Sequence, residues 1–329
     1  MRAMSFNTTM LNDERGFEAA VALLIEGECV ALPTETVYGL AALADEQAAV
    51  EKVFAAKRRP ADHPLIVHIP SAEHLSVWAE DIPDIAYRLA DNFWPGPLTL
   101  LLRKRADVSS IVTGGLETVA VRVPSHPLFL SILQRLDKGL AAPSANLYKQ
   151  LSPTTAEQVM KSLSGRIAAV LDGGPCEFGL ESTILSLVTA SPAILRAGPV
   201  ARGQIESVLG GPVQMPVSHD VAVPGNVESH YQPNTSLQMM TAEQMVTTFI
   251  DGRSGYLVWS SRASSILDGT RLDGTHIRQL AEDPRLYGRD LYRSLYELDQ
   301  LGLDGIIVES PPTSEIWMAV NDRLRRAAN

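Results

Sequence analysis

Several features are scarce or missing in this sequence of 329 residues. It has two cysteines, Cys29 and Cys176, which lie far apart, so neither a disulfide framework nor a zinc-binding spacing is present. No run of about 18 apolar residues occurs, which is the length that a membrane-spanning helix needs, and the N-terminus has no signal-peptide core. We therefore expect a cytoplasmic protein of a reducing compartment, without a membrane partner.

Basic charge is also in short supply. The formal net charge is −10, and no lysine follows Lys161. Because non-specific affinity for nucleic acid comes from neutralising phosphates, RNA binding over the whole surface is not expected. A local basic groove stays open as an alternative, and with it the hypothesis of an RNA-binding module. The Walker A pattern is missing as well, which excludes a P-loop nucleotide site.

The most informative stretch of the chain contains three motifs in close succession. A threonine-rich turn opens it, in the motif PTETVYGL at 33–40, and an amphipathic helix follows. That helix ends in the cations of KRRP at 57–60, and the apolar strand PLIVHI at 64–69 comes after a short loop. Adjacent cations beside such a turn indicate a site for an anion such as phosphate. The alternative is a solvated helix end whose cations favour the helix dipole.

Arg122 is the single charge within the apolar strand TVAVRVP. A buried cation is costly unless it is paired, so we expect a carboxylate beside it. Its guanidinium fork suits either a protein carboxylate, in a structural ion pair, or the carboxylate of a ligand.

The order of expected elements predicts two domains. Strands and helices alternate through residues 1–209 without regular βαβ repeats, which favours a mixed-sheet α/β domain. Residues 210–236 are rich in proline and have no helical or strand period, so they predict a linker. Residues 237–329 alternate again and predict a smaller α/β domain.

Ten segments together resemble one known family. In chain order they are PTETVYGL, KRRP, PLIVH, FWPGPLTL, TVAVRVP, APSAN, SPTTA, DGGPC, ESTI and LRAG. This order resembles the YrdC-like threonylcarbamoyl-AMP synthases, and HYQP with the terminal NDRLRRAA resembles their long two-domain form, with a C-terminal Sua-type domain. The resemblance implies a YrdC-like mixed twisted sheet with helices, followed by a smaller Rossmann-like α/β domain.

The resemblance also implies an activity. Such an enzyme makes L-threonylcarbamoyl-AMP and pyrophosphate from L-threonine, bicarbonate or CO₂, and ATP. The product would feed the threonylcarbamoyladenosine modification of tRNA beside the anticodon. The tRNA threonylcarbamoyl transferase machinery would then be an indirect partner, and no direct contact with nucleic acid is required. The rival interpretation is a carbamoyltransferase that uses the same groove, but the zinc-finger and acylphosphatase parts of such enzymes are missing from this sequence.

Site residues follow from the family motifs position by position. The K-x-R and S-x-N motifs imply that catalysis depends on Lys57, Arg59, Ser144 and Asn146. The positions that match ATP contacts are Arg59, His63, Thr118, Ser144, Ser152, Arg196 and Tyr231. The positions that match the threonine pocket are Thr36, His68, Arg122, Ser182 and, through its backbone, Ala142.

No dedicated metal site is expected. His63 and His68 do not make one, because side chains alternate along a strand and these two are five positions apart. Any metal would be Mg²⁺ that arrives with ATP and keeps most of its waters. The linker is predicted to be a lid that excludes water from a labile intermediate, and a plain spacer is the alternative. Tyr148-Lys149 departs from the Ser-Gly pair that the family often has after APSAN.

Overall fold

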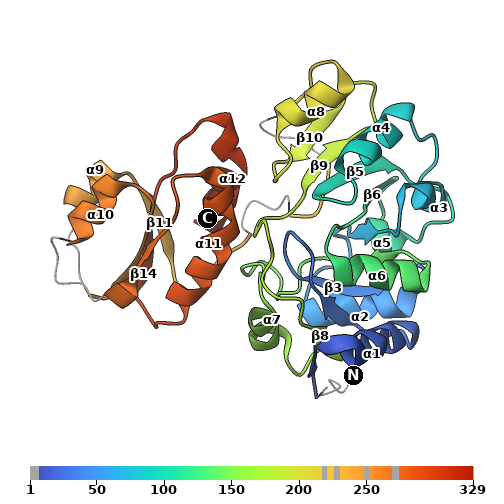
Figure 1. The fold of residues 1–329 in the computed structure, drawn as a ribbon, viewed down its shortest axis with the longest axis horizontal. Helices are drawn as coiled ribbons and strands as arrows, with labels where there is room; N and C mark the ends of the chain where they lie inside the picture. Colours follow the sequence, from blue (N-terminus) through green and yellow to red (C-terminus); the bar gives the residue numbers. More distant parts are fainter. Residues whose placement is uncertain (1–6, 217–220, 226–229, 248–251, 269–273, 329) are drawn as a thin grey trace. The chain divides into compact units, whose positions relative to one another are not determined.

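The computed structural model describes residues 7–216, 221–225, 230–247, 252–268 and 274–328. The chain divides into two compact units, and Figure 1 shows their elements coloured along the sequence. The first unit consists of Met1–Tyr148, Pro153–Glu177 and Glu181–Asn226, and the second of Lys149–Ser152, Phe178–Leu180 and Val227–Asn329. The expected linker at 210–236 is thus shared between the units, and residues 217–220 and 226–229 of it lie outside the described part.

The first unit is built on a ten-stranded mixed sheet, which confirms the expected mixed α/β fold. Parallel and antiparallel neighbours both occur, since β4 pairs parallel with β6 and antiparallel with β7. In spatial order the strands are β1 (Thr9–Leu11), β8 (Ala169–Leu171), β2 (Val30–Leu32), β3 (Gly39–Leu43), β7 (Leu140–Ala141), β4 (Ile66–His68), β6 (Thr118–Arg122), β5 (Leu98–Arg103), β9 (Thr183–Ser186) and β10 (Ala193–Arg196).

Helices of this unit pack on both faces of the sheet. They are α1 (Asp13–Ile25), α2 (Gln47–Lys57), α3 (Leu75–Trp78), α4 (Asp84–Phe93), α5 (Ser110–Thr113), α6 (Pro127–Leu136), α7 (Ala156–Leu163) and α8 (Arg202–Leu209), with a 3₁₀ turn at Ala72–His74. Residues of α2, α3, α4, α5 and α8 form one core with alternate residues of β4, β5 and β6. Residues of α1 and α6 pack on the opposite face, over β2, β3, β7 and β8.

One end of that opposite face is covered differently. Because strand side chains alternate, Ile66 and Ala120 point away from the core that contains Val67 and Val121. Their cluster is completed by residues from β5, β9 and β10 and by Val223 of the expected linker, which is 5% exposed. By the same alternation, His68 and Arg122 of the candidate site lie on this face.

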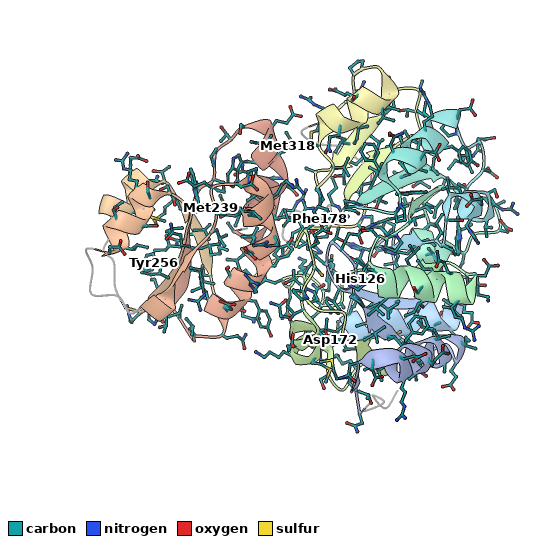
Figure 2. All side chains as sticks on the ribbon, in the orientation of Figure 1. His126, Asp172, Phe178, Met239, Tyr256 and Met318 are labelled. Atoms are coloured by element: carbon teal, nitrogen blue, oxygen red, sulfur yellow. The ribbon has the colours of Figure 1, made fainter. Side chains whose placement is uncertain are left out.

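The second unit contains a four-stranded, fully parallel sheet, as the Rossmann-like expectation requires. Its strands in spatial order are β11 (Leu237–Met240), β14 (Gly305–Glu309), β12 (Ser254–Val258) and β13 (Ile277–Gln279). Its helices are α9 (Ala242–Thr247), α10 (Ser261–Asp268), α11 (Pro284–Asp299) and α12 (Met318–Ala327), with 3₁₀ turns at Gly274–His276 and Glu315–Trp317. Figure 2 labels Met239 and Tyr256 on the strands of this sheet. None of the helices in the described part of the chain has the length and hydrophobicity needed to cross a bilayer.

Candidate active site

The threonine-rich turn after β2 is fixed by its own first threonine. The Oγ1 atom of Thr34 accepts hydrogen bonds from the backbone N–H groups of Thr36, at 3.0 Å, and Val37, at 3.1 Å. This is the local side-chain bonding by which threonine stabilises a turn against regular secondary structure. The turn places Glu35 and Thr36 in the interior, where they are 3% and 1% exposed.

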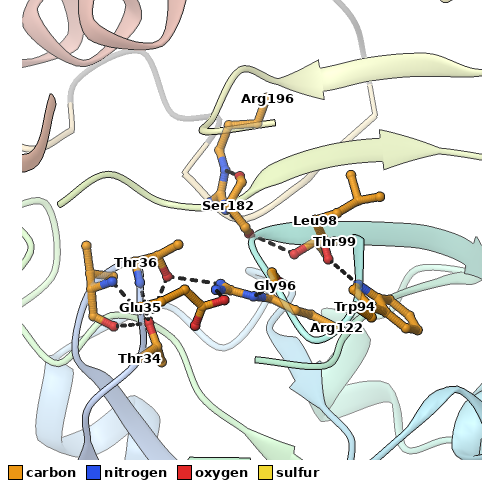
Figure 3. A network of polar contacts seen from close by, with 11 residues as sticks. Thr34, Glu35, Thr36, Trp94, Gly96, Leu98, Thr99, Arg122, Ser182 and Arg196 are labelled. Carbon is orange, nitrogen blue, oxygen red and sulfur yellow. Dashed lines mark hydrogen bonds and ion pairs between the residues drawn. The ribbon is translucent and has the colours of Figure 1, made fainter. Parts of the chain in front are cut away.

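Arg122 joins this turn to the sheet. It stands opposite His68 in the parallel pairing of β4 and β6. Its Nε donates to the carbonyl oxygen of Gly96 at 3.1 Å, and its Nη1 donates to Thr36 Oγ1 at 3.0 Å (Figure 3). Arg122 is 3% exposed, and these two hydrogen bonds hold its guanidinium in one orientation.

The third nitrogen of Arg122 meets a protein carboxylate. Nη2 lies 2.7 Å from Oε1 of Glu35. The pair is nevertheless poorly aligned, since neither oxygen of Glu35 nor Nη2 of Arg122 has a hydrogen-bond partner of good geometry among the described residues. Burial pushes the pKa of Glu35 upward, but the charge and contact of Arg122 and nearby backbone N–H groups outweigh it, so the pKa lies below its usual value.

Glu35 is the main site residue that the sequence motifs did not single out. The sequence left open whether Arg122 pairs with a protein or a ligand carboxylate, and the structure supplies the protein carboxylate. The sequence did contain a signal for this residue, because Glu35 is the only charged residue between Glu28 and Asp45. A lone charge in an apolar stretch needs a partner of opposite sign, as Arg122 does.

His68 lies beside the same guanidinium as a buried ring. It stacks on Phe129 of α6, with ring centroids 5.1 Å apart and an interplanar angle of 27°. Burial, with the positive charge of Arg122, places the pKa of His68 well below its usual value. The ring therefore stays uncharged at neutral pH, and Arg122 is the cation of this group of residues.

Ser182 and Arg196 form the adjoining part of the network. Ser182 Oγ is 2.7 Å from Oγ1 of Thr99, a β5 residue that the motifs did not identify. Arg196 donates from Nη2 to Ser182 Oγ at 3.0 Å and from Nη1 to the carbonyl oxygen of Pro224 at 2.8 Å. Figure 3 shows the contacts of Ser182 with Thr99 and Arg196 near Arg122. Arg196 thus anchors the first half of the expected linker to the same face of the sheet.

The K-x-R and S-x-N motifs contact each other through Lys57. Lys57 is 1% exposed, and its Nζ donates to the carbonyl oxygen of Asn146 at 2.7 Å and to that of Ser144. Burial and the nearby charge of Arg59 place the pKa of Lys57 well below its usual value. The side-chain amino group of Lys57 donates both hydrogen bonds to the backbone of the S-x-N turn.

Backbone pairing joins that turn to the threonine-rich motif. The N–H of Leu40 donates to the carbonyl oxygen of Pro143 at 2.7 Å, and that of Ala145 donates to Tyr38 at 2.8 Å. Ala142, just before the turn, donates its N–H to Ile66 at 3.1 Å. The structure thus brings PTETVYGL, APSAN and strand β4 together, and their assignment to the threonine pocket stays a prediction.

Arg59 is the second cation of the K-x-R motif. Its Nη2 donates to the carbonyl oxygen of Pro64 at 3.1 Å, and its guanidinium carbon lies 5.9 Å from the ring centroid of Tyr148. The ring of His63 packs edge-on against Tyr148, with centroids 5.4 Å apart. The departure from the family pattern at Tyr148 therefore places an aromatic ring between two predicted ATP residues. Thr118 lies at the start of β6, on the same strand as Arg122.

Ser152 and Tyr231 belong to the second unit. The Tyr231 ring is buried there, 5.7 Å from the ring of Tyr292 and 5.3 Å from the guanidinium carbon of Arg323. Their assignment to the ATP site stays a prediction. Within the described residues, no group of three or more His, Cys, Asp or Glu side chains is arranged to hold a metal ion.

Comparisons with known proteins agree with the motifs. A family model described as "Telomere recombination", that of the Sua5, YciO and YrdC proteins, matches residues 22–198. A model described as "Threonylcarbamoyl-AMP synthase, C-terminal domain" matches residues 200–329. The threonylcarbamoyl-AMP synthase of Bacillus subtilis is 39% identical over 337 residues, covering 96% of this chain and 94% of the relative. That of Pyrococcus abyssi is 37% identical over 322 residues, covering 96% and 95%.

A solved structure extends the agreement to the fold. The crystal structure of P. abyssi Sua5 complexed with L-threonine superimposes with a TM-score of 0.87 at 35% identity and covers 98% of each chain. Both units are included in that match. The chain belongs to the threonylcarbamoyl-AMP synthase family, as its motifs predicted.

Proposed function

We propose that this protein synthesises L-threonylcarbamoyl-AMP and pyrophosphate from L-threonine, bicarbonate or CO₂, and ATP. The observation that carries the proposal is the network around Arg122. Two of its nitrogens are fixed by Gly96 and Thr36, and Nη2 lies 2.7 Å from the carboxylate of Glu35. Such a guanidinium is oriented in advance for the carboxylate of an amino acid. The solved relative from P. abyssi was complexed with L-threonine.

In the proposed reaction, the network around Arg122 binds threonine, and the K-x-R and S-x-N motifs bind ATP. The amine of threonine, once deprotonated, adds to CO₂ and gives a carbamate. A carbamate oxygen then attacks the α-phosphorus of ATP, the bond from that phosphorus to the bridging oxygen breaks, and pyrophosphate leaves with the electron pair. The described site offers no covalent nucleophile at this position, so its contribution is positioning and neutralisation of charge.

The K-x-R and S-x-N motifs bind the phosphate groups of ATP in this proposal. Arg59 supplies positive charge for the leaving pyrophosphate, and the Ser144 hydroxyl and Asn146 amide supply directed hydrogen bonds. Lys57 fixes the backbone from which these two side chains project. His63, Thr118, Ser152, Arg196 and Tyr231 complete the proposed ATP contacts. Mg²⁺ enters as part of the nucleotide substrate, bound to its phosphate oxygens.

The proposal extends to the place of the reaction in the cell. We place it in the cytoplasm, supported by two free, buried cysteines in the described structure. The product is a reactive mixed anhydride that would be passed to the enzymes that modify tRNA with threonylcarbamoyladenosine.

The test is the release of pyrophosphate from ATP by the purified protein, measured with and without threonine and bicarbonate. Release that requires both, with threonylcarbamoyl-AMP identified by mass spectrometry, is the expected result. Release with carbamoyl phosphate in place of threonine and bicarbonate would indicate a carbamoyltransferase instead. Tight RNA binding without any release would indicate an RNA-binding module.

A further inference from the structure

The ion pair between Glu35 and Arg122 is not accounted for by the proposed chemistry. Both side chains are 3% exposed, and their closest atoms are 2.7 Å apart. A buried pair of this kind seldom stabilises a fold more than apolar residues of the same size would, because desolvation offsets the attraction. A carboxylate beside a cation that has to bind a substrate carboxylate also competes with that substrate. Its presence therefore needs a reason other than stability.

The geometry of the pair shows that it is only half satisfied. Among the described residues, the 2.7 Å contact of Nη2 of Arg122 with Glu35 does not reach ideal hydrogen-bond geometry at either partner. Buried polar atoms in this condition gain from any ligand that completes their hydrogen bonds. The pair sets a negative and a positive group side by side in the interior, so it is complementary to a ligand that carries both charges.

Threonine is such a ligand, since it is a zwitterion. The guanidinium can take its carboxylate, and the field of Glu35 favours its ammonium group at the distances over which charges interact in a low-dielectric interior. A ligand that brings only a carboxylate meets a cation whose charge is already offset. Of the other titratable groups near Glu35, His126 supplies no second cation, because burial lowers its pKa. Cys176 supplies no second anion, because burial raises the pKa of its thiol.

We propose that Glu35 is a specificity-determining residue that makes the Arg122 site select zwitterionic amino acids over plain carboxylic acids. It acts through Arg122, as a positioning residue that offsets the guanidinium charge. The inference rests on the proposed function, because it takes Arg122 as the threonine site. Recognition of a carboxylate by Arg122 alone would accept any carboxylic acid. With Glu35 present, the ligand must also carry a positive charge beside its carboxylate.

The experiment compares two ligands by isothermal titration calorimetry at one pH, namely threonine and 3-hydroxybutanoate, which is threonine without its amino group. The wild-type protein should bind threonine at least about tenfold more tightly, as one opposite-charge interaction in a partly buried site provides. Glu35→Gln keeps the shape of the side chain and removes its charge, so the preference should narrow by about tenfold, through a gain for 3-hydroxybutanoate.

The matched control is Glu28→Gln, which removes the carboxylate of a half-exposed pair with Lys52 and should leave the preference unchanged. If Glu35→Gln lowered the affinities for both ligands by the same factor, the ion pair would be merely structural and the inference would be overturned. Equal affinities of the wild-type protein for the two ligands would overturn it without any variant, even if Glu35→Gln failed to fold. Absence of threonine binding to the wild-type protein would overturn the proposed function and this inference with it.

Discussion

The side-chain nitrogen of Lys57 lies 2.7 Å from the carbonyl oxygen of Asn146, so the first residue of the K-x-R motif binds the backbone of the S-x-N motif. A second carbonyl, that of Ser144, accepts from the same nitrogen. Helix α2 therefore ends by fixing the turn from which two proposed phosphate ligands project. Lys57 acts in this structure as a positioning residue, and Arg59 is the neighbouring cation of the motif.

The first prediction concerns Lys57. Lys57→Met should lower the free energy of unfolding by about 2 kcal/mol or more, because it leaves two buried carbonyl groups without a donor. Pyrophosphate release should fall as well, since the S-x-N turn loses its anchor. Urea denaturation and the pyrophosphate assay measure the two effects. Lys52→Met on the same helix is the control. It removes a half-exposed pair with Glu28, worth no more than about 1 kcal/mol, and one hydrogen bond to the carbonyl oxygen of Gly27, so it should cost less stability than Lys57→Met. Equal stability of the two variants would contradict the anchoring role.

The second prediction concerns Arg59. Arg59→Ala should reduce threonine-dependent pyrophosphate release by about a hundredfold or more, because a cation on the leaving group contributes mainly in the transition state. Circular dichroism should show an unchanged fold. Arg58→Ala, at the exposed neighbouring position, is the matched control and should keep wild-type turnover. A folded Arg59→Ala protein with near-native turnover would remove Arg59 from the phosphate site.

The third prediction concerns Arg122. Arg122→Lys should weaken threonine binding by about tenfold or more while ATP binding is unchanged, because an ammonium group cannot reproduce the planar fork that Gly96 and Thr36 orient. Calorimetric titration with each ligand separately measures this. Loss of affinity for both ligands to the same extent, or unfolding, would mean that Arg122 serves only the ion pair with Glu35.

The fourth prediction concerns the linker. Val213 and Val223 pack within the first unit, so the informative truncation removes residues 227–329 and keeps these side chains. If the linker is a lid, the remaining fragment should fold, bind ATP and make less threonylcarbamoyl-AMP per ATP consumed, because water reaches the labile intermediate. Tyr231→Ala in the full chain should show part of the same defect.

The readout for the linker is the ratio of threonylcarbamoyl-AMP to pyrophosphate, quantified in one reaction. Tyr87→Ala, which changes a partly exposed tyrosine of α4, is the control and should leave the ratio at its wild-type value. A ratio that stays constant in both the truncated protein and Tyr231→Ala would identify the linker as a plain spacer.

The sequence by itself determined the family, the mixed-sheet character of the first part of the chain and the α/β character of the second. It could do so because motif order and the alternation of strands and helices are local properties of the chain. It also identified Arg122 as a cation in need of a carboxylate, because a charge within an apolar strand is costly wherever that strand lies.

Only the tertiary structure decided which groups meet. Glu35 and Arg122 are 87 positions apart, and Lys57 and Asn146 are 89 apart, so no spacing rule connects either pair. The pairing register of β4 with β6 sets His68 beside Arg122, and the fold of the turn after β2 directs Glu35 at the guanidinium. The role of Lys57 as a backbone anchor, and the role of Val223 in covering one end of the sheet, depend on such long-range packing, which local patterns in the sequence do not encode.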